Sequence, residues 1–418
     1  MIETRSMWRV GSASFVGALL EWYDFYVFAT ASALVFGHLF FPSGDPVAST
    51  MASFGAFASG FLARPFGGLL FGHLGDRVGR KTSLVATLAI IGAGTFLIGL
   101  LPTYAQVGTL APVLLVALRV AQGIGLGGEY GGASLIAIEH APRSRRGFWG
   151  SLPQCASPGG LLLATAVFGL ASLLPQDAFT AWGWRVPFLV SGVLLVVGLY
   201  VRLHVAETPE FLAIKAGNQA PIVELLRTHP RSTALATGAR LAETVAGNLV
   251  KSFGLSYATL QLGLGRDVAL GALVATSAVG LIVTPLYGVL ADRFGARTLY
   301  AAGAALACVL AFPMFCVLDA RTVAAAWLGF VVFYNLGPTL MLSVQATFFA
   351  DLFAPSVRYT GLSFAYQVSA VVGGFTPLAA LWLLDWRGGA PWAVAAALAA
   401  VALTSLLCTV AAGRHARR

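Results

Sequence analysis

The sequence predicts an all-α membrane protein with twelve transmembrane helices arranged in two six-helix bundles. Three observations lead to this prediction. The 418-residue chain is 58% hydrophobic and only 10% charged, with a mean hydropathy of +0.81, whereas soluble domains carry about 25% charged residues. It contains twelve long apolar runs. A short charged motif also occurs twice, about half the chain apart, so the two halves are internal repeats.

Each predicted helix is an apolar run, since a membrane span needs about 20 such residues. In chain order the runs cover residues 12–40, 47–72, 82–102, 110–137, 148–174, 184–203, 232–261, 268–291, 297–318, 322–348, 359–384 and 390–412. The longest polar connector separates an N-terminal bundle (1–203) from a C-terminal bundle (232–418). This connector, residues 204–231, is expected to be a cytoplasmic linker along the inner membrane surface.

The basic residues predict the orientation of the chain. With both termini in the cytoplasm, the cytoplasmic segments hold 18 of the 26 Lys and Arg residues, the outer loops hold 4, and 4 lie inside helices. Cytoplasmic loops of membrane proteins are enriched in Lys and Arg. The net charge of +9 is therefore explained without a nucleic-acid partner. We expect a monomer surrounded by lipid in a bacterial inner membrane.

Other classes of site are not indicated. The four cysteines lie in apolar runs and are expected to be free thiols. No His, Cys, Asp or Glu cluster has metal-ligand spacing, and no nucleotide-binding motif is present. We therefore expect no metal and no cofactor.

The repeated motif combines glycine with charge. The first copy contains Gly72, Asp76, Arg77, Gly79 and Arg80. The second copy contains Gly288, Asp292, Arg293 and Gly295, each 216 positions later (288 − 72). Glycine permits a tight reversal, and aspartate can cap a helix start. We expect both copies to form cytoplasmic turns that act as gate loops.

Two carboxylates lie in the first apolar run. Glu21 and Asp24 are three positions apart and share one helix face. A charge in mid-membrane costs about 2.5–3.5 kcal/mol, and neighbouring carboxylates in a low dielectric raise each other's proton affinity. They are candidate proton carriers, with Asp24 favoured because it lies deeper. The alternative is a solvated pair at the cytoplasmic mouth.

The fourth run carries a polar stripe within a glycine-rich sequence. Arg119, Gln122 and either Glu129 or Tyr130 fall on one helical face. Arg119 can hold a substrate carboxylate through a bidentate pair, or pair with Asp24 or Glu129 and release that carboxylate on protonation. A structural ion pair between helices one and four is the alternative.

The seventh run carries Arg240, Glu243 and Lys251. Arg240 and Glu243 are spaced to satisfy each other, although Arg240 is also a candidate substrate contact. Lys251 has no acidic neighbour in its own helix, and a lone buried lysine requires an anion. We interpret Lys251 as a substrate contact. The alternative is pairing with a helix-one carboxylate across the bundle.

Weaker candidates for substrate contact are polar side chains inside apolar helices, most of which bridge helices. They are Tyr26, Asn248, Asn335 and Gln367. Pro338 follows Asn335 and predicts a kink in the tenth helix that could serve as a gate hinge.

Several of these stretches resemble the metabolite:proton symporter family of the major facilitator superfamily. The repeated motif resembles the superfamily loop between helices two and three, and the residues from Leu20 to Tyr26 and from Arg119 to Gly132 resemble the family itself. Family members carry α-ketoglutarate, citrate, shikimate, proline or betaine. The resemblance implies alternating access between two bundles of inverted three-helix repeats. It also implies proton coupling through Asp24, Arg119 and Glu129.

The second half matches the family pattern more loosely, with Ala296 where the first motif has Arg80. The sequence thus predicts a secondary transporter, not an enzyme, that imports a small organic anion together with protons. Two alternatives stay open. One is a symporter of a zwitterion such as proline or betaine, whose cationic end Glu243 or Glu129 could hold. The other is a proton-driven efflux pump.

Overall fold

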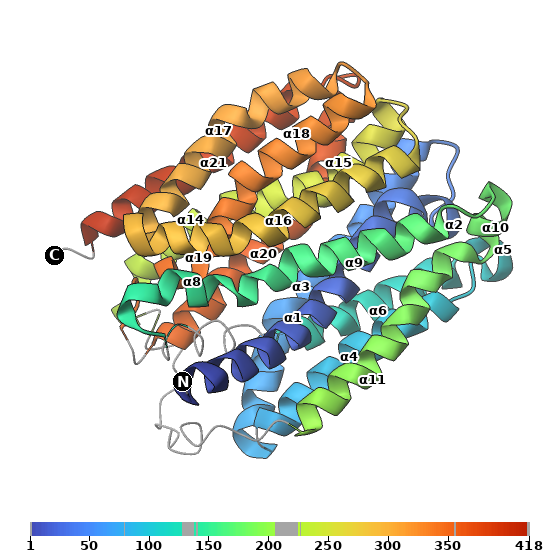
Figure 1. The fold of residues 1–418 in the computed structure, drawn as a ribbon. Coiled ribbons are helices and arrows are strands. Elements are labelled where there is room, and N and C mark those ends of the chain that lie inside the picture. Colours follow the sequence, from blue (N-terminus) through green and yellow to red (C-terminus); the bar gives the residue numbers. More distant parts are fainter. Residues whose placement is uncertain are drawn as a thin grey trace.

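The computed structural model describes residues 2–78, 80–127, 138, 141–204, 225, 227–354 and 357–415. In these residues all regular secondary structure is helical. Long helices run side by side through one bundle, and the first and last helices have their chain ends at the same end of it (Figure 1). This end is called the terminal end below.

The N-terminal half contributes six long helical segments. They are α1 (Ile2–Leu34), α3 (Pro46–Val78), α4 (Arg80–Leu100), α6 (Leu110–Gly127), a composite segment and α11 (Val186–His204). The composite segment consists of α8 (Arg146–Ser151), η2 (Pro153–Cys155) and α9 (Ala156–Ala171). The short helices α2 (Phe36–Phe40), α5 (Tyr104–Val107) and α10 (Gln176–Ala181) lie at the end opposite the terminal end (Figure 1).

The C-terminal half repeats this plan. Its first segment joins α14 (Pro230–Asn248), η4 (Leu249–Phe253), α15 (Gly254–Ser256) and η5 (Tyr257–Gln261). The other five are α16 (Arg266–Phe294), α17 (Ala296–Leu318), the broken helix α18 (Val323–Leu336) and α19 (Pro338–Ala350), α20 (Arg358–Trp386) and α21 (Trp392–His415).

Each of the twelve predicted runs corresponds to a helical segment, so the predicted fold class is confirmed. Nine helices of the described residues are long and apolar enough to cross a membrane, and Val85–Leu100 is a shorter apolar helix. α1 and α14 are not among the nine, because the charges of Glu21, Asp24, Arg240 and Glu243 lower their hydropathy. The run 110–137 is described only as far as Gly127.

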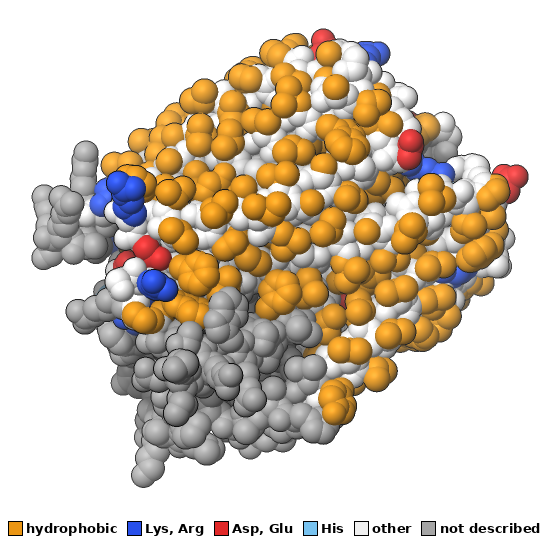
Figure 2. All heavy atoms as spheres, viewed as in Figure 1, with side chains coloured by type: hydrophobic (Ala, Val, Ile, Leu, Met, Phe, Trp, Pro, Cys, Tyr) orange, Lys and Arg blue, Asp and Glu red, His pale blue; other side chains and the backbone are white. Residues whose placement is uncertain are grey.

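The surface agrees with a membrane environment. Figure 2 shows hydrophobic side chains over the long face of the bundle, with Lys, Arg, Asp and Glu gathered toward its two ends. Exposed large side chains on this apolar surface include Leu170, Val193 and Ile282. A lipid bilayer is the solvent in which such a face is stable.

The gate motifs differ from the predicted turns. Gly72, Asp76 and Arg77 belong to α3, and Gly288, Asp292 and Arg293 belong to α16. The second copy turns only at Gly295, whose φ of +88° favours glycine. The reversal thus needs one left-handed residue, so most of the motif remains helical. Gly79 and the side chains of the first copy, Arg80 included, lie outside the described residues, as do positions 205–224 and 226 of the linker.

The predicted kink in the tenth helix is confirmed. α18 ends at Leu336, and α19 begins at Pro338 after the single residue Gly337. Pro338 occupies the first turn of α19, where its missing N–H removes no helical hydrogen bond.

Candidate transport site

Six charged side chains of the described residues are buried, each with at most 7% of its surface exposed. Two are acidic and four are basic: Asp24, Glu243, Arg64, Arg119, Arg240 and Lys251. A buried charge is stable only when it has partners. The partners of each charge therefore separate structural groups from groups that are free to change.

Asp24 has few partners for a buried carboxyl group. It lies on α1, is 6% exposed, and interacts with the hydroxyl of Thr95 on α4. Its Oδ1 atom has no hydrogen-bond partner, and no cation of the described residues forms an ion pair with it. Glu21, the second candidate proton carrier, is half-buried on the same helix. Asp24 is thus the more buried of the two.

Arg119 lies on α6 and is 1% exposed, yet it has no carboxylate partner among the described residues. Its Nη1 donates a long hydrogen bond of 3.4 Å to Oε1 of Gln122. The Nε2 atom of Gln122 donates in turn to Oγ1 of Thr95 at 2.7 Å. The close packing of α6 on α3 that buries Arg119 requires Gly123, because a side chain there would clash with the carbonyl of Gly60.

Aromatic rings surround the Arg119 guanidinium. Its Cζ lies 4.3 Å from the ring centre of Phe28, 5.1 Å from that of Phe57 and 5.7 Å from that of Phe25. Cation–π attraction in a desolvated site reaches about 2 kcal/mol. These rings therefore stabilise a buried arginine that has no anionic partner.

The direct pair between Arg119 and Asp24 considered from the sequence is absent from this structure. Thr95 and Gln122 stand between the two groups, so Asp24 and Arg119 are connected through two neutral side chains. Glu129 and Tyr130, the other predicted members of this stripe, lie outside the described residues.

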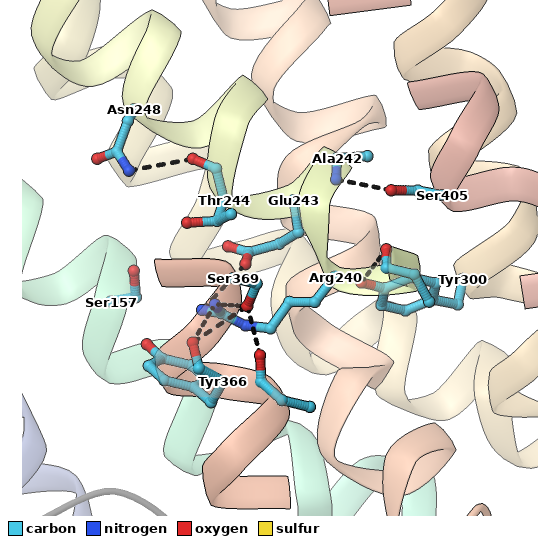
Figure 3. Close-up of polar contacts among 12 residues, drawn as sticks. Ser157, Arg240, Ala242, Glu243, Thr244, Asn248, Tyr300, Tyr366, Ser369 and Ser405 are labelled. Carbon is cyan, nitrogen blue, oxygen red and sulfur yellow. Dashed lines mark hydrogen bonds and ion pairs between the residues drawn. The ribbon is translucent and has the colours of Figure 1, made fainter. Parts of the chain in front are cut away.

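Arg240 and Glu243 form the predicted ion pair, with Nη2 and Oε2 3.4 Å apart. Nη1 of Arg240 also donates to the carbonyl of Tyr366 at 3.0 Å and to Oγ of Ser369 at 2.7 Å. Figure 3 shows the guanidinium lying against the Tyr366 ring, 3.4 Å from its centre. Protein groups thus hold Arg240 from several sides, which favours a structural role over substrate contact.

Lys251 lies where the two halves meet. Its Nζ donates to the hydroxyl of Tyr26 on α1 at 3.0 Å, and this hydroxyl is 2.7 Å from Oγ of Ser157 on α9. The predicted alternative, a pair with a helix-one carboxylate, is therefore wrong for this structure, since the helix-one partner is a phenol. Tyr26 is fully buried and connects Lys251 to the N-terminal half.

The backbone around Lys251 is unusual. η4 and η5 are π-helical segments, a rare form that occurs mostly as single turns inside α-helices and is frequent at functional sites. A Cβ atom at Gly247 would lie 3.3 Å from Nζ of Lys251 and 4.0 Å from Oε1 of Glu243. Lys251 and Glu243 therefore flank this glycine, although Glu243 pairs with Arg240.

The weaker candidates bond either within their own helix or to a neighbouring helix. Nδ2 of Asn248 donates to the carbonyl of Thr244 at 3.1 Å, and Nδ2 of Asn335 donates to the carbonyl of Thr276 at 3.2 Å. Nε2 of Gln367 on α20 reaches the carbonyl of Gly127 on α6 at 3.4 Å. Among the described residues, no group donates to the amide oxygens of Asn248, Asn335 and Gln367, so a ligand could donate to these acceptors.

Asp292 joins the two halves at the terminal end. Its Oδ1 and Oδ2 accept hydrogen bonds from the backbone N–H groups of Gly147 (2.6 Å) and Phe148 (3.1 Å) at the start of α8. A carboxylate is stabilised at a helix N-terminus. This second motif copy thus makes an inter-half contact, as a gate requires.

The opposite end is also bridged. Nη2 of Arg266 on α16 donates to Oε1 of Gln176 on α10 at 2.6 Å, and the guanidinium lies 4.3 Å from the ring centre of Phe179. Contacts between the halves therefore exist at both ends and at the centre. We call this arrangement, in which described residues of the two halves are in contact at both ends, the closed arrangement.

Sequence reasoning missed Thr95, Ser157 and the phenylalanines around Arg119. Thr95 and Ser157 are single hydroxyl residues in apolar runs, a pattern that carries no functional signal. Phe25 and Phe28 were visible beside Asp24, but phenylalanine in a membrane helix usually faces lipid or neighbouring helices.

Comparisons with known proteins identify the family. A family model described as sugar (and other) transporter matches residues 11–232 and again residues 222–413. The chain belongs to this family of the major facilitator superfamily. The double match agrees with two repeated halves, and the resemblance read from the sequence is confirmed.

The relatives are bacterial membrane transporters. The shikimate transporter of Escherichia coli (strain K12) is 39% identical over 96% of this chain and 93% of its own. An inner membrane metabolite transport protein of the same strain is 41% identical over 96% of this chain and 93% of its own. A proline/betaine transporter of Salmonella typhimurium is 32% identical over 92% of this chain and 79% of its own. The protein is thus a multi-span membrane transporter, not an enzyme.

Solved structures show the same fold. The proton:xylose symporter bound to 6-bromo-6-deoxy-D-glucose has a TM-score of 0.74 at 18% identity, covering 98% of this chain and 95% of its own. The xylose transporter of E. coli in a partially occluded inward-open conformation has a TM-score of 0.73 at 19% identity. The match covers 97% of this chain and 96% of that chain. At this identity the likeness establishes the fold alone.

Proposed function

We propose that the protein is a proton-coupled symporter that imports a small organic anion of the carboxylate class by alternating access. The observation that carries this proposal is the charge of the buried centre, where four cations face two acids among the described residues. One acid, Glu243, is already paired with Arg240. The remaining cations favour an anionic ligand.

Asp24 is the proposed proton carrier. Its carboxyl group is buried and, within the part of the chain that the structure describes, lacks a cationic partner and has an unsatisfied oxygen. An ionised carboxylate in this setting would be costly, so the closed arrangement fits the protonated acid. When the proton leaves, the Asp24 carboxylate needs a cation. Arg119 lies against α1 within about one turn of Asp24, at Phe25 and Phe28.

Lys251 and Arg119 are the proposed anion contacts. A substrate carboxylate would replace the Tyr26 hydroxyl as the acceptor for Lys251, and the unsatisfied amide oxygens of Asn248, Asn335 and Gln367 would accept hydrogen bonds from substrate hydroxyl groups. Binding would then separate Lys251 from Tyr26. Because this hydrogen bond links the two halves, substrate occupancy and the closed state become coupled.

The proposed orientation places the terminal end in the cytoplasm of a bacterium, with both chain ends inside. Asp292 and its contacts with α8 then form part of the inner gate. The distribution of Lys and Arg supports this orientation, as does the relative named as an inner membrane protein.

A zwitterion symporter is less well supported. Glu243, one of the two predicted holders of a cationic end, is engaged by Arg240, and the other, Glu129, lies outside the described residues. An efflux pump for amphipathic compounds would favour a less cationic centre than the one observed.

Uptake into proteoliposomes tests the proposal. Labelled shikimate, citrate, α-ketoglutarate, a monocarboxylate, proline and betaine would each be offered under an inward proton gradient, with and without protonophore. We expect one anion to accumulate and its accumulation to collapse with protonophore. Accumulation of only proline or betaine would overturn the anion assignment, and gradient-independent equilibration would overturn proton coupling.

Lys251→Ala tests the anion contact. Loss of the ammonium group should raise the apparent KM for the transported anion about tenfold or more, since a charged hydrogen bond contributes about 1.5–3 kcal/mol. An unchanged KM would remove Lys251 from the site.

A further inference from the structure

Lys251 occupies an aromatic cage. Its Nζ lies 4.8 Å from the ring centre of Tyr26, 5.6 Å from that of Tyr334 and 5.9 Å from that of Trp22. The Trp22 and Tyr26 rings are stacked, with centres 5.3 Å apart. Three rings around one ammonium group form the arrangement that recognises quaternary ammonium ligands in other proteins.

The cage lies between the two halves. Trp22 and Tyr26 come from α1, Tyr334 comes from α18, and Lys251 enters from η4. Tyr26, Tyr334 and Lys251 are each at most 6% exposed. A ligand reaching this point would be fully enclosed, in the position where alternating-access transporters hold substrate.

We propose that Lys251 is a built-in occupant of this cage and acts as a specificity determinant that excludes quaternary ammonium compounds. The inference rests on the proposed function, because it explains how an anion carrier avoids ligands such as betaine. The Lys251 ammonium fills the space that a trimethylammonium group would need, and its charge repels a second cation. The same ammonium attracts a carboxylate.

Removing the Lys251 side chain should therefore allow the cage to bind a quaternary ammonium ion that the unchanged protein excludes. Lys251→Ala deletes about as many heavy atoms as a trimethylammonium group contains, and it leaves the three rings in place. The opened cage should bind tetramethylammonium. Each ring contributes a cation–π contact, so we expect affinity at least about tenfold above that of the unchanged protein.

Lys251→Met is the matched control. Methionine is neutral, unbranched and flexible, so its side chain should still fill the cage. Both variants lose the charge, but only Lys251→Ala opens space. A second control, Tyr334→Leu in the Lys251→Ala background, removes one ring and should weaken the gained affinity several-fold.

The experiment measures binding of tetramethylammonium chloride and glycine betaine to the purified full-length protein by isothermal titration calorimetry. Anion uptake by the unchanged protein is measured in parallel. We expect weak or no binding to the unchanged protein and to Lys251→Met, and clear binding to Lys251→Ala. If Lys251→Ala does not fold, Lys251→Ser opens nearly the same space and replaces it.

Two results would overturn the inference. One is a folded Lys251→Ala variant that gains no affinity for tetramethylammonium. The other is equally tight binding to the unchanged protein, which would show that Lys251 excludes nothing. These outcomes are separate from the test of the proposed function. If Lys251→Ala gains affinity for tetramethylammonium but the unchanged protein transports no anion, the inference about the cage stands and the anion proposal fails. If the unchanged protein takes up an anion but Lys251→Ala gains no such affinity, the anion proposal stands and the inference about the cage fails.

Discussion

Arg119 in the N-terminal half and Arg240 in the C-terminal half are both buried, yet their surroundings differ. Arg240 pairs with Glu243 and donates to Tyr366 and Ser369. Arg119 has one long hydrogen bond to Gln122 and lies among phenylalanine rings. The difference supports the proposal that Arg240 holds helices together and that Arg119, which has no carboxylate partner among the described residues, exchanges partners during transport.

The acids show the same contrast. Glu243 lies 3.4 Å from its cation, while among the described residues Asp24 interacts with the hydroxyl of Thr95 and keeps one unsatisfied oxygen. We infer that the N-terminal half carries the proton switch and that the C-terminal half carries a fixed ion pair beside the anion contact.

The largest expected effect concerns Asp24. Asp24→Asn keeps the shape of the side chain but cannot release a proton, so accumulation against a gradient should fall to the level seen with protonophore. Exchange of substrate across the membrane should persist. Both are measured with labelled anion in proteoliposomes, and Glu21→Gln, which neutralises the half-buried acid of the same helix, serves as the control. Retained uphill uptake by Asp24→Asn would contradict the assignment.

The fixed ion pair is tested by stability. Arg240→Ala leaves Glu243 buried without a cation and should destabilise the protein by about 3–5 kcal/mol. The double variant Arg240→Met with Glu243→Leu should recover most of this loss, because apolar groups replace both charges. Thermal unfolding in detergent measures both variants.

The same double replacement distinguishes the two arginines. Arg119→Met with Asp24→Leu should leave the protein folded but abolish proton-driven uptake. Arg240→Met with Glu243→Leu should retain proton coupling. Loss of coupling in the Arg240 variant, despite a stable fold, would show that the C-terminal pair also takes part in the switch.

A smaller effect is expected from the ring nearest Arg119. Phe28→Leu removes a cation–π contact of about 1–2 kcal/mol. This contact holds Arg119 among the rings and away from Asp24, so its loss favours pairing of Arg119 with the ionised Asp24 carboxylate. More acid would then be required to protonate Asp24. The midpoint of the pH profile of uptake should move down by about one pH unit.

Phe168→Leu is the control for this prediction. Phe168 is fully buried in the same half and packs on Phe188, with no cation over its ring among the described residues. It should alter stability without moving the pH midpoint. Equal shifts in the two variants would mean that packing, not the Arg119 contact, sets the profile.

The smallest effect is expected at the gate. Asp292→Asn replaces a carboxylate at the start of α8 and should weaken the closed end by about 1 kcal/mol. With one spin label at the start of α8 and another at the end of α16, the distance distribution of Asp292→Asn should contain a larger share of long distances than that of the unchanged protein. Asp45→Asn is the control, since Asp45 accepts a hydrogen bond from the N–H of Val47 within one half. A shift in both variants would argue against a gate.

The fold could be predicted from the sequence because apolar runs of membrane length and a repeated motif constrain it strongly. The Arg240–Glu243 pair was also predictable, since three-residue spacing places the two side chains together in a regular helix. The partners of Lys251 and Arg119 were not predictable. They lie on other helices, and Tyr26, Tyr334 and Phe57 are brought together only by the packing of the bundle.

The gate motifs illustrate a different limit. Gly, Asp and Arg in a short charged segment predict a turn, but α16 continues through Asp292 and reverses at Gly295 alone. Local composition predicts that the chain reverses direction near this motif. The residue at which α16 ends depends on its packing against the N-terminal half. The role of Asp292 at α8 depends on residues 144 and 145 positions away, which no local pattern reveals.

The most direct test of the account is proton movement driven by the anion. Proteoliposomes containing a pH-sensitive dye would receive a saturating pulse of the transported anion without an imposed proton gradient. The account predicts acidification of the lumen with the unchanged protein and none with Asp24→Asn, although both variants take up the anion. Acidification of equal size in both would show that Asp24 does not carry the proton.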